Sequence, residues 1–169
     1  MIAILPRSAV AVFVIVGLLW PLAGASDAGD GAQGLPPELS DSLVPAPDLT
    51  PHEVVRIQLK ALRRNDAENR GIAVAFRFAS PANKASTGPL PRFIHMIKAG
   101  PYRMMLEFEH AAYGSLEVDG DGAAQKVTLV GHEDVVTFVF LLKRQRGALC
   151  QGCWMTEGVV VVPGAGRPA

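Results

Sequence analysis

Side chains that bind metal ions are few in this chain and poorly spaced for the purpose. Besides two cysteines, the chain has four histidines, at His52, His95, His110 and His132. None of them falls into a spacing such as H-x-H or H-E-x-x-H, which would place two ligands on one ion. A zinc site needs three or four ligands, so the sequence predicts no metal site, and we expect no cofactor.

An excess of charge of either sign is also missing. The 16 Lys and Arg residues balance 16 Asp and Glu residues, so the chain has no overall attraction to nucleic acid or to an anionic membrane. The basic clusters at residues 63–64 and 143–146 are too short to indicate a binding tail. No internal repeat is present, and 169 residues are enough for one domain.

One apolar run lies near the N-terminus, and it is short. Arg7 is followed by apolar residues from Ala9 to Trp20 and then by Ala23-Gly24-Ala25. This order is typical of a secretory signal peptide, and the run is shorter than the roughly 20 residues that cross a bilayer. No cysteine follows it directly, so lipid attachment there has no acceptor. We expect residues 1–25 to be cleaved and the protein to be exported to a periplasm, the extracellular space or an equivalent lumen, with an uncleaved anchor as the alternative.

Residues 26–49 lack the apolar content of a folded core. They are rich in Asp, Gly, Ala, Ser and Pro, and prolines interrupt their few apolar side chains. Such a stretch buries too little apolar surface to offset the entropy of ordering it, so we expect a flexible linker. The tail, residues 163–169, reads PGAGRPA and is expected to be disordered for the same reason. A single domain therefore remains between residues 50 and 162.

Helical periodicity dominates the first half of this domain. Thr50, Pro51 and Glu53 form a capping-box pattern with proline in its preferred place. Apolar residues then repeat every three or four positions as far as Leu62. We expect three helices, at about residues 51–65, 71–79 and 89–99, the second ended by Ser80-Pro81 and the third by Gly100-Pro101.

In the second half of the domain, the alternating pattern of strands replaces the helical periodicity. Apolar and polar side chains alternate from Met104 to His110, which predicts a half-buried strand. The run D-G-D-G at residues 119–122 is a strong turn signal. Further strands are expected at residues 124–130, 135–142 and 153–162. Helices followed by an antiparallel meander indicate an α+β fold, with about three N-terminal helices packed on a sheet of about four strands.

Three segments carry a resemblance to a known family. They are residues 76–84 (FRFASPANK), 87–93 (TGPLPRF) and 152–156 (GCWMT). They resemble an uncharacterised exported or organellar family, a domain of unknown function of the nuclear-transport-factor-2-like class, over most of residues 50–162. The resemblance implies a cone, in which helices pack on a curved antiparallel sheet. This class includes isomerases, dehydratases, ligand carriers and subunit-interaction domains, so the fold implies no single activity.

Cys150 and Cys153 have the C-x-x-C spacing of a redox motif. A reactive pair needs a helix N-terminus or basic neighbours to lower the thiol pKa, whereas this pair lies where a loop enters a predicted strand. We expect inert thiols or a local disulfide, and a catalytic redox role is the alternative.

Glu107 and His110 are the candidates for acid–base catalysis. Glu107 and Glu109 share one face of the first predicted strand, and His110 shares the other face with Phe108. Paired carboxylates can act as general acid and base if burial separates their pKa values. Carboxylates on the wet face of a strand are commoner, as is a hydrogen-bonded histidine at the edge of a core.

Six residues are the candidates for a ligand site, namely Asn83, Lys84, Arg92, Tyr102, Arg103 and Trp154. All but the last lie around the third predicted helix, and connections of this kind often carry binding groups. The cations would bind an anion or a polar headgroup, with Trp154 as an apolar platform. The alternative is structural, with Asn83 capping a turn, Lys84 solvated and Tyr102 packed across a helix end.

The function expected from these observations is binding without catalysis. The domain would bind a small ligand or a protein partner outside the cytoplasm. A small hydrolyase or isomerase, with a carboxylate or histidine inside the cone, is the first alternative. A self-associating module such as a homodimer is the second. A deep pocket that contains Glu107 or His110 would favour the enzyme, and a filled cone would favour the interaction module.

Overall fold

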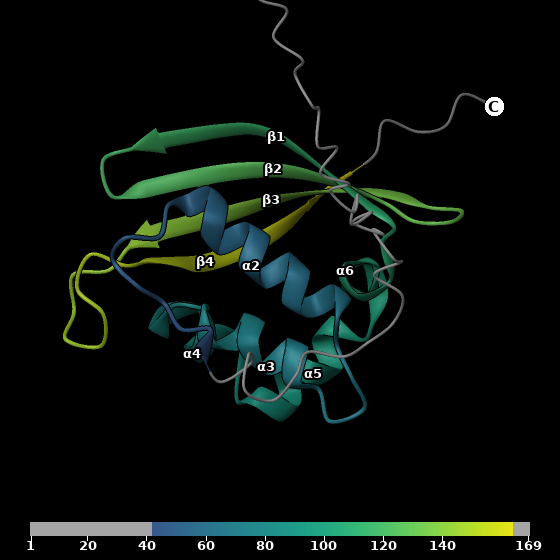
Figure 1. The fold of residues 1–169 in the computed structure, drawn as a ribbon, viewed down its shortest axis with the longest axis horizontal. Helices are drawn as coiled ribbons and strands as arrows, with labels where there is room; N and C mark the ends of the chain where they lie inside the picture. The colour runs from purple at the N-terminus through teal and green to yellow at the C-terminus, as the bar shows by residue number, and fades with distance from the viewer. Residues whose placement is uncertain (1–41, 164–169) are drawn as a thin grey trace, which may run out of the picture. The chain divides into compact units, whose positions relative to one another are not determined.

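The computed structural model describes residues 42–163, in which a layer of helices covers one face of an antiparallel sheet (Figure 1). The helices are α2 (Pro51–Arg63), α3 (Arg70–Arg77), α4 (Pro81–Thr87), α5 (Leu90–Ile97), the 3-10 helix η1 (Gly100–Arg103) and α6 (Met104–Glu107). The strands are β1 (His110–Asp119), β2 (Gly122–Val130), β3 (Val135–Arg144) and β4 (Trp154–Val162), side by side in chain order. The expected signal peptide, the linker up to residue 41 and the tail from residue 164 lie outside the described residues.

Helix α2 begins as the sequence predicts. The Thr50 hydroxyl accepts a hydrogen bond from the backbone N–H of Glu53 at 3.3 Å, and the Glu53 carboxylate accepts one from the backbone N–H of Thr50 at 2.8 Å. These bonds satisfy N–H groups that the first helical turn leaves without partners. The bond from the Thr50 backbone lowers the pKa of Glu53 most strongly. One side of α2, including Val55 and Leu59, is buried against the sheet and α3.

Helix α4 was not predicted. Ser80 caps it, because its hydroxyl accepts a hydrogen bond from the backbone N–H of Asn83 at 3.1 Å, and Pro81 occupies the first helical position. The segment PANKAST has no apolar stripe, and Asn83 is its one buried residue. Hydrophobic periodicity therefore carried no signal here, although the Ser-Pro cap is visible in the sequence.

The strand predicted at residues 104–110 is wrong over most of its length. Residues 104–107 instead form α6, directly after η1, and β1 begins only at His110. Met105 and Phe108 are the two buried residues of this stretch, and their separation of three positions is a helical spacing. The flanking Met104 and Leu106 are partly buried, so alternating hydrophobicity over so few residues did not distinguish a helical turn from a strand.

The β1–β2 turn and the sheet register follow the pattern in the sequence. Gly120 has a φ of 55° in this turn, a conformation that glycine adopts without a steric penalty. In the β2–β3 pairing, Val127 lies opposite Phe138, and both are fully buried on the face that meets the helices. The next pair, Thr128 and Thr137, therefore lies on the opposite face, which we call the outer sheet face.

The last residues of the expected linker contact the domain. Leu43 and Leu49 pack against the core, and the Arg77 guanidinium donates a hydrogen bond to the Leu43 carbonyl at 2.8 Å. Residues just before Thr50 therefore pack against the domain.

The α+β class and a four-stranded antiparallel sheet are confirmed, whereas the number of helices is corrected. Five α-helices and a 3-10 helix occur among the described residues instead of about three, and helical structure extends to Glu107 rather than ending in the N-terminal part. None of the helices in residues 42–163 has both the length and the apolar character needed to cross a membrane.

Candidate functional site

A cavity of about 180 Å³ lies between the helices and the β3–β4 side of the sheet. Each of the helices α2 to α6 and η1 contributes to its wall. The apolar lining comes from Leu62, Ala75, Ala79, Phe93, Met96, Ile97, Met105, Phe140 and Val159. The polar lining comes from Gln58, Asn83, Ser86, Thr87, Thr156 and Glu157, with Tyr102 presenting both a ring and a hydroxyl. An apolar enclosure with a few polar groups is the usual character of a small-molecule site.

Three of the polar side chains are held by one hydrogen-bond network. Gln58 donates through its side-chain amide to the Ala75 carbonyl at 3.0 Å and accepts from the Thr156 hydroxyl at 2.7 Å. The Asn83 amide donates to the Thr156 carbonyl at 3.0 Å. The network links helices α2, α3 and α4 to strand β4, so the polar side of the cavity is fixed before any ligand arrives.

Asn83 retains one free acceptor at this wall. Asn83 is 8% exposed, and its Nδ2 group donates a hydrogen bond to the Thr156 carbonyl. Within residues 42–163, its Oδ1 atom takes part in no hydrogen bond. A side-chain amide can make two donor and two acceptor contacts, so the Asn83 carbonyl is available to a donor in the cavity.

Among the described residues that line the cavity, one has a charged side chain, Glu157. Glu157 has no partner in the β3–β4 register, because Leu141 pairs with Gly158 and Leu142 pairs with Thr156. This extra residue makes a β-bulge, a feature that redirects side chains at a strand edge. Among the described residues that line the cavity, there is no lysine, arginine or histidine. The site is therefore unsuited to neutralising an anion.

The structure brings only two of the six predicted ligand-site residues, Asn83 and Tyr102, to this cavity. The Tyr102 hydroxyl donates to the Val159 carbonyl at 3.1 Å, and its ring stacks on Phe138 with centroids 6.1 Å apart. Trp154 is buried away from the cavity, with the Arg144 guanidinium 4.8 Å above its ring.

The three predicted cations do not line the cavity, and each has a contact of its own. The Lys84 ammonium donates to the Arg77 carbonyl at 3.2 Å and lies 5.4 Å from the Phe76 ring centroid. Burial, and to a lesser degree the neighbouring Arg77, lowers the pKa of Lys84. Exposed Arg92 lies against Gly88, and exposed Arg103 pairs with Glu107 at 2.7 Å. The arrangement does not gather these cations around one anion.

The two catalytic candidates are both exposed. Glu107 forms the ion pair with Arg103 on the outer side of α6, and His110 is the first residue of β1. Neither is among the residues that line the cavity. In the described part of the chain, no three His, Cys, Asp or Glu side chains are grouped so that they could hold a metal ion.

Gln58 and Thr156 were missed, although Gln58 had a visible signal. Gln58 lies four positions after Val54 and three after Val55, inside the apolar stripe of α2. A polar side chain on a buried helical face needs an internal hydrogen-bond partner, which would have marked it as part of a network. Thr156 had no such signal, because its partners lie on α2 and α4, far away in the sequence.

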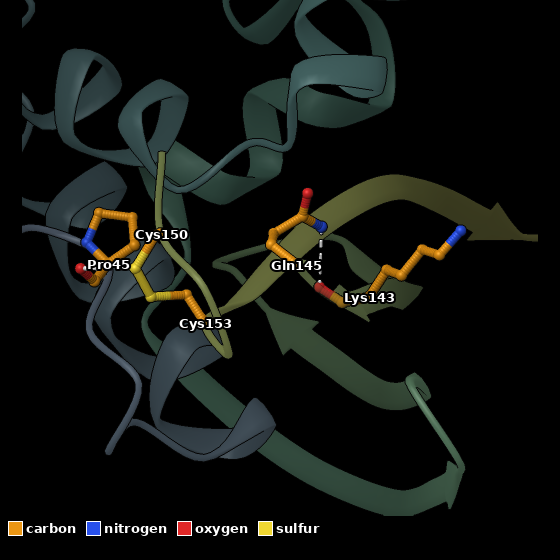
Figure 2. The surroundings of a disulfide bond; sticks show 5 residues. All are labelled: Pro45, Lys143, Gln145, Cys150 and Cys153. Atoms are coloured by element: carbon orange, nitrogen blue, oxygen red, sulfur yellow. Dashed lines mark hydrogen bonds between the residues drawn. A yellow bond between two sulfur atoms is a disulfide. The ribbon is translucent and has the colours of Figure 1, made fainter. Parts of the chain in front are cut away.

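Cys150 and Cys153 are joined by a disulfide in the connection between β3 and β4 (Figure 2). Their Cα atoms are 5.6 Å apart, within the range that a disulfide spans. The Cys150 sulfur lies 3.6 Å from the Pro45 carbonyl oxygen, so the loop contacts the segment that precedes α2. This position supports a structural role for the pair.

Comparison with known proteins identifies a family. The family model "Domain of unknown function (DUF4864)" matches residues 46–168. No curated protein gives a significant match, and no solved structure does either. The matched range contains every residue of the cavity wall together with the disulfide loop. The chain therefore belongs to the DUF4864 family, a domain of unknown function.

Proposed function

We propose that this domain binds a small ligand in the cavity and does not transform it. The proposal rests on the residues that line the cavity. A mainly apolar enclosure of about 180 Å³ presents a polar network whose members hold one another in place. Such preorganisation reduces the entropy that binding would otherwise cost.

The residues of the wall favour binding over catalysis. General acid–base chemistry needs a titratable group within hydrogen-bond reach of the reacting atom. Glu107 and His110 are outside the cavity, and the Tyr102 hydroxyl is used by the Val159 carbonyl. Glu157 is the one carboxylate among the described lining residues, so the pair of groups that a hydrolyase or isomerase would employ is not assembled there.

Benzene is a direct probe of this proposal, because apolar cavities of similar size bind it. We expect benzene to bind the purified domain saturably, measured by amide chemical shifts of residues at the cavity. The substitution Ala75→Leu places a larger side chain in the wall and should remove this binding, because Ala75 lines the cavity and is buried. The matched control is Ala85→Leu, at an exposed position of α4 outside the wall, which should bind benzene as the unmodified domain does.

The outcome that contradicts the proposal is equally clear. If benzene still changes the amide chemical shifts saturably and to the same extent in Ala75→Leu, it binds outside the cavity. An absence of saturable binding in the unmodified domain would show that the cavity does not take up a ligand of this size.

Self-association through the outer sheet face is a second candidate, favoured by its apolar side chains. Val135 and Val160 on this face are 64% and 51% exposed, and Leu141, which pairs with Gly158, lies near Val160. Four strands of nine or ten residues present roughly 600 Å² per copy at ordinary strand spacing. Two copies would bury about 1,200 Å², the lower end of stable interfaces.

Sedimentation equilibrium distinguishes this candidate from a monomeric domain. A dimer built on the outer sheet face should dissociate on Val160→Lys. The equally exposed Val118→Lys should leave the dimer intact, because Val118 pairs with Ala123 on the opposite face. A protein that is monomeric at all accessible concentrations would rule out the dimer.

The proposal also includes export of the protein and a fold of the nuclear-transport-factor-2-like cone class. The residues before Ser26 support cleavage after Ala25, and the mass of the exported chain would reveal an intact Met1 if cleavage did not occur. Helices on one face of a four-stranded antiparallel sheet, with a cavity between the layers, support the nuclear-transport-factor-2-like class. An experimental structure with a different strand order would contradict it.

A further inference from the structure

The size of the cavity suits a ligand of about one ring. A cavity of 150 Å³ lined by Leu, Ile and Phe in another protein binds benzene. The present cavity, at about 180 Å³, exceeds it by about the 30 Å³ that one water molecule occupies in the liquid. A single six-membered ring with one additional small polar group therefore fits the available space.

The apolar part of the wall suits such a ring. Phe93 and Phe140 supply aromatic surface from α5 and β3, and Met96 and Met105 supply flexible thioether side chains. Methionine sulfur makes favourable contacts with aromatic rings and adapts to irregular shapes. These four side chains lie on different elements, so they can enclose the ring from several sides.

The polar part of the wall offers a hydrogen-bond acceptor to a ligand. The Asn83 Oδ1 atom belongs to a residue that is 8% exposed, keeps some contact with solvent and, as far as residues 42–163 show, has no hydrogen-bond partner in the protein. A hydrogen bond that replaces one to water contributes about 0.5–1.5 kcal/mol, so a molecule that supplies an O–H group there gains affinity. A ligand that supplies only acceptors gains nothing from this atom.

Charge at the wall excludes one class of ligand. An anion that enters an apolar site loses its hydration and needs a cation or several donors in return. The described lining residues include Glu157 and no cation, and Lys84, Arg92 and Arg103 are not among them. A carboxylate attached to the same ring should therefore be rejected.

We propose that the cavity selects an uncharged, single-ring molecule that carries one hydroxyl group, with the ring against the Phe93–Phe140 wall and the hydroxyl donating to Asn83 Oδ1. This assignment rests on the proposed ligand-binding function and names the ligand class. The phenol class has these properties, and phenol itself is the simplest probe.

The test compares three ring compounds, each titrated into the mature protein and followed by amide chemical shifts. Benzene tests binding of the ring alone. Phenol tests the contribution of a hydroxyl donor, and benzoate tests the effect of an anionic acceptor on the same ring. We expect phenol to bind about 5- to 10-fold more tightly than benzene, which corresponds to one ordinary hydrogen bond. Benzoate should show no saturable binding.

Two substitutions on α4 locate the donor contact. Asn83→Leu should abolish the preference for phenol over benzene while benzene still binds. Ser86→Ala is the matched control, because Ser86 also lines the cavity, and it should preserve the preference. If Asn83→Leu does not fold, the comparison of benzene, phenol and benzoate in the unmodified protein still tests the ligand class.

The possible results separate the two proposals. If neither benzene nor phenol binds, the proposed function fails and this inference fails with it. If benzene binds as tightly as phenol, or benzoate binds more tightly than either, the cavity binds ligands but the ligand class is wrong. If Asn83→Leu retains the full preference for phenol, the hydroxyl does not contact Asn83.

Discussion

The substitution Gly71→Ala should destabilise this domain by about 3 kcal/mol, the upper part of the range for overpacking. In an ordinary helix the same change is stabilising by about 1 kcal/mol, because glycine has the greater chain entropy. Here a Cβ atom on Gly71 would collide with the backbone carbonyl of Ala61 and lie 2.9 Å from the Asn65 Cα atom. Backbone atoms cannot rotate away, so α2 and α3 would have to separate.

Urea unfolding measures this effect, and a second glycine provides the control. Gly147 lies in the β3–β4 connection, and a Cβ atom there would meet nothing within 4 Å. Gly147→Ala should therefore be neutral or stabilising by up to about 1 kcal/mol. Equal urea midpoints for Gly71→Ala and the unmodified domain would show that the corner between α2 and α3 is not closely packed.

The substitution Gln58→Leu should also cost about 3 kcal/mol, for a different reason. Gln58 is 5% exposed, and its side chain satisfies both the Ala75 carbonyl and the Thr156 hydroxyl. Leucine has a similar size but no polar atoms, so two buried groups would lose their partner. Each such loss costs about 1–3 kcal/mol. Thermal or urea unfolding measures the sum.

A double substitution separates lost hydrogen bonds from altered packing. Thr156→Val removes the hydroxyl that Gln58→Leu leaves without a partner, so the double variant should be more stable than the sum of the single losses by about 1 kcal/mol or more. Gln151→Leu, at an exposed position of the disulfide loop, is the control and should change stability by less than about 0.5 kcal/mol. Strict additivity of the two substitutions would contradict the network.

Local signals in the sequence determined most of the elements. The first helix follows from Thr50, Pro51 and Glu53, whose capping box acts within one turn. The β1–β2 turn follows from the glycines of residues 119–122, and the later strands follow from their hydrophobic patterns. These features depend on residues within a few positions of one another, so a single sequence is enough to read them.

Two local predictions failed where the signal was short or polar. Residues 104–107 alternate like a strand but form a helical turn, because burial of Met105 and Phe108 suits a spacing of three. Helix α4 has no apolar stripe, since its buried residue is the polar Asn83. Asn83 is stabilised there by the Thr156 carbonyl, 73 positions later, and no local pattern encodes that contact.

The sequence by itself determined the α+β order and the residues available to a site, and only the tertiary structure decided which of those residues meet. Asn83 and Tyr102 reach the cavity, whereas Lys84, Arg92 and Arg103 do not line it. Gln58 joins the wall from a helix that carried no site prediction. The physical reason is that a cavity is the space left between packed elements, so its lining depends on how all the helices and the sheet fit together.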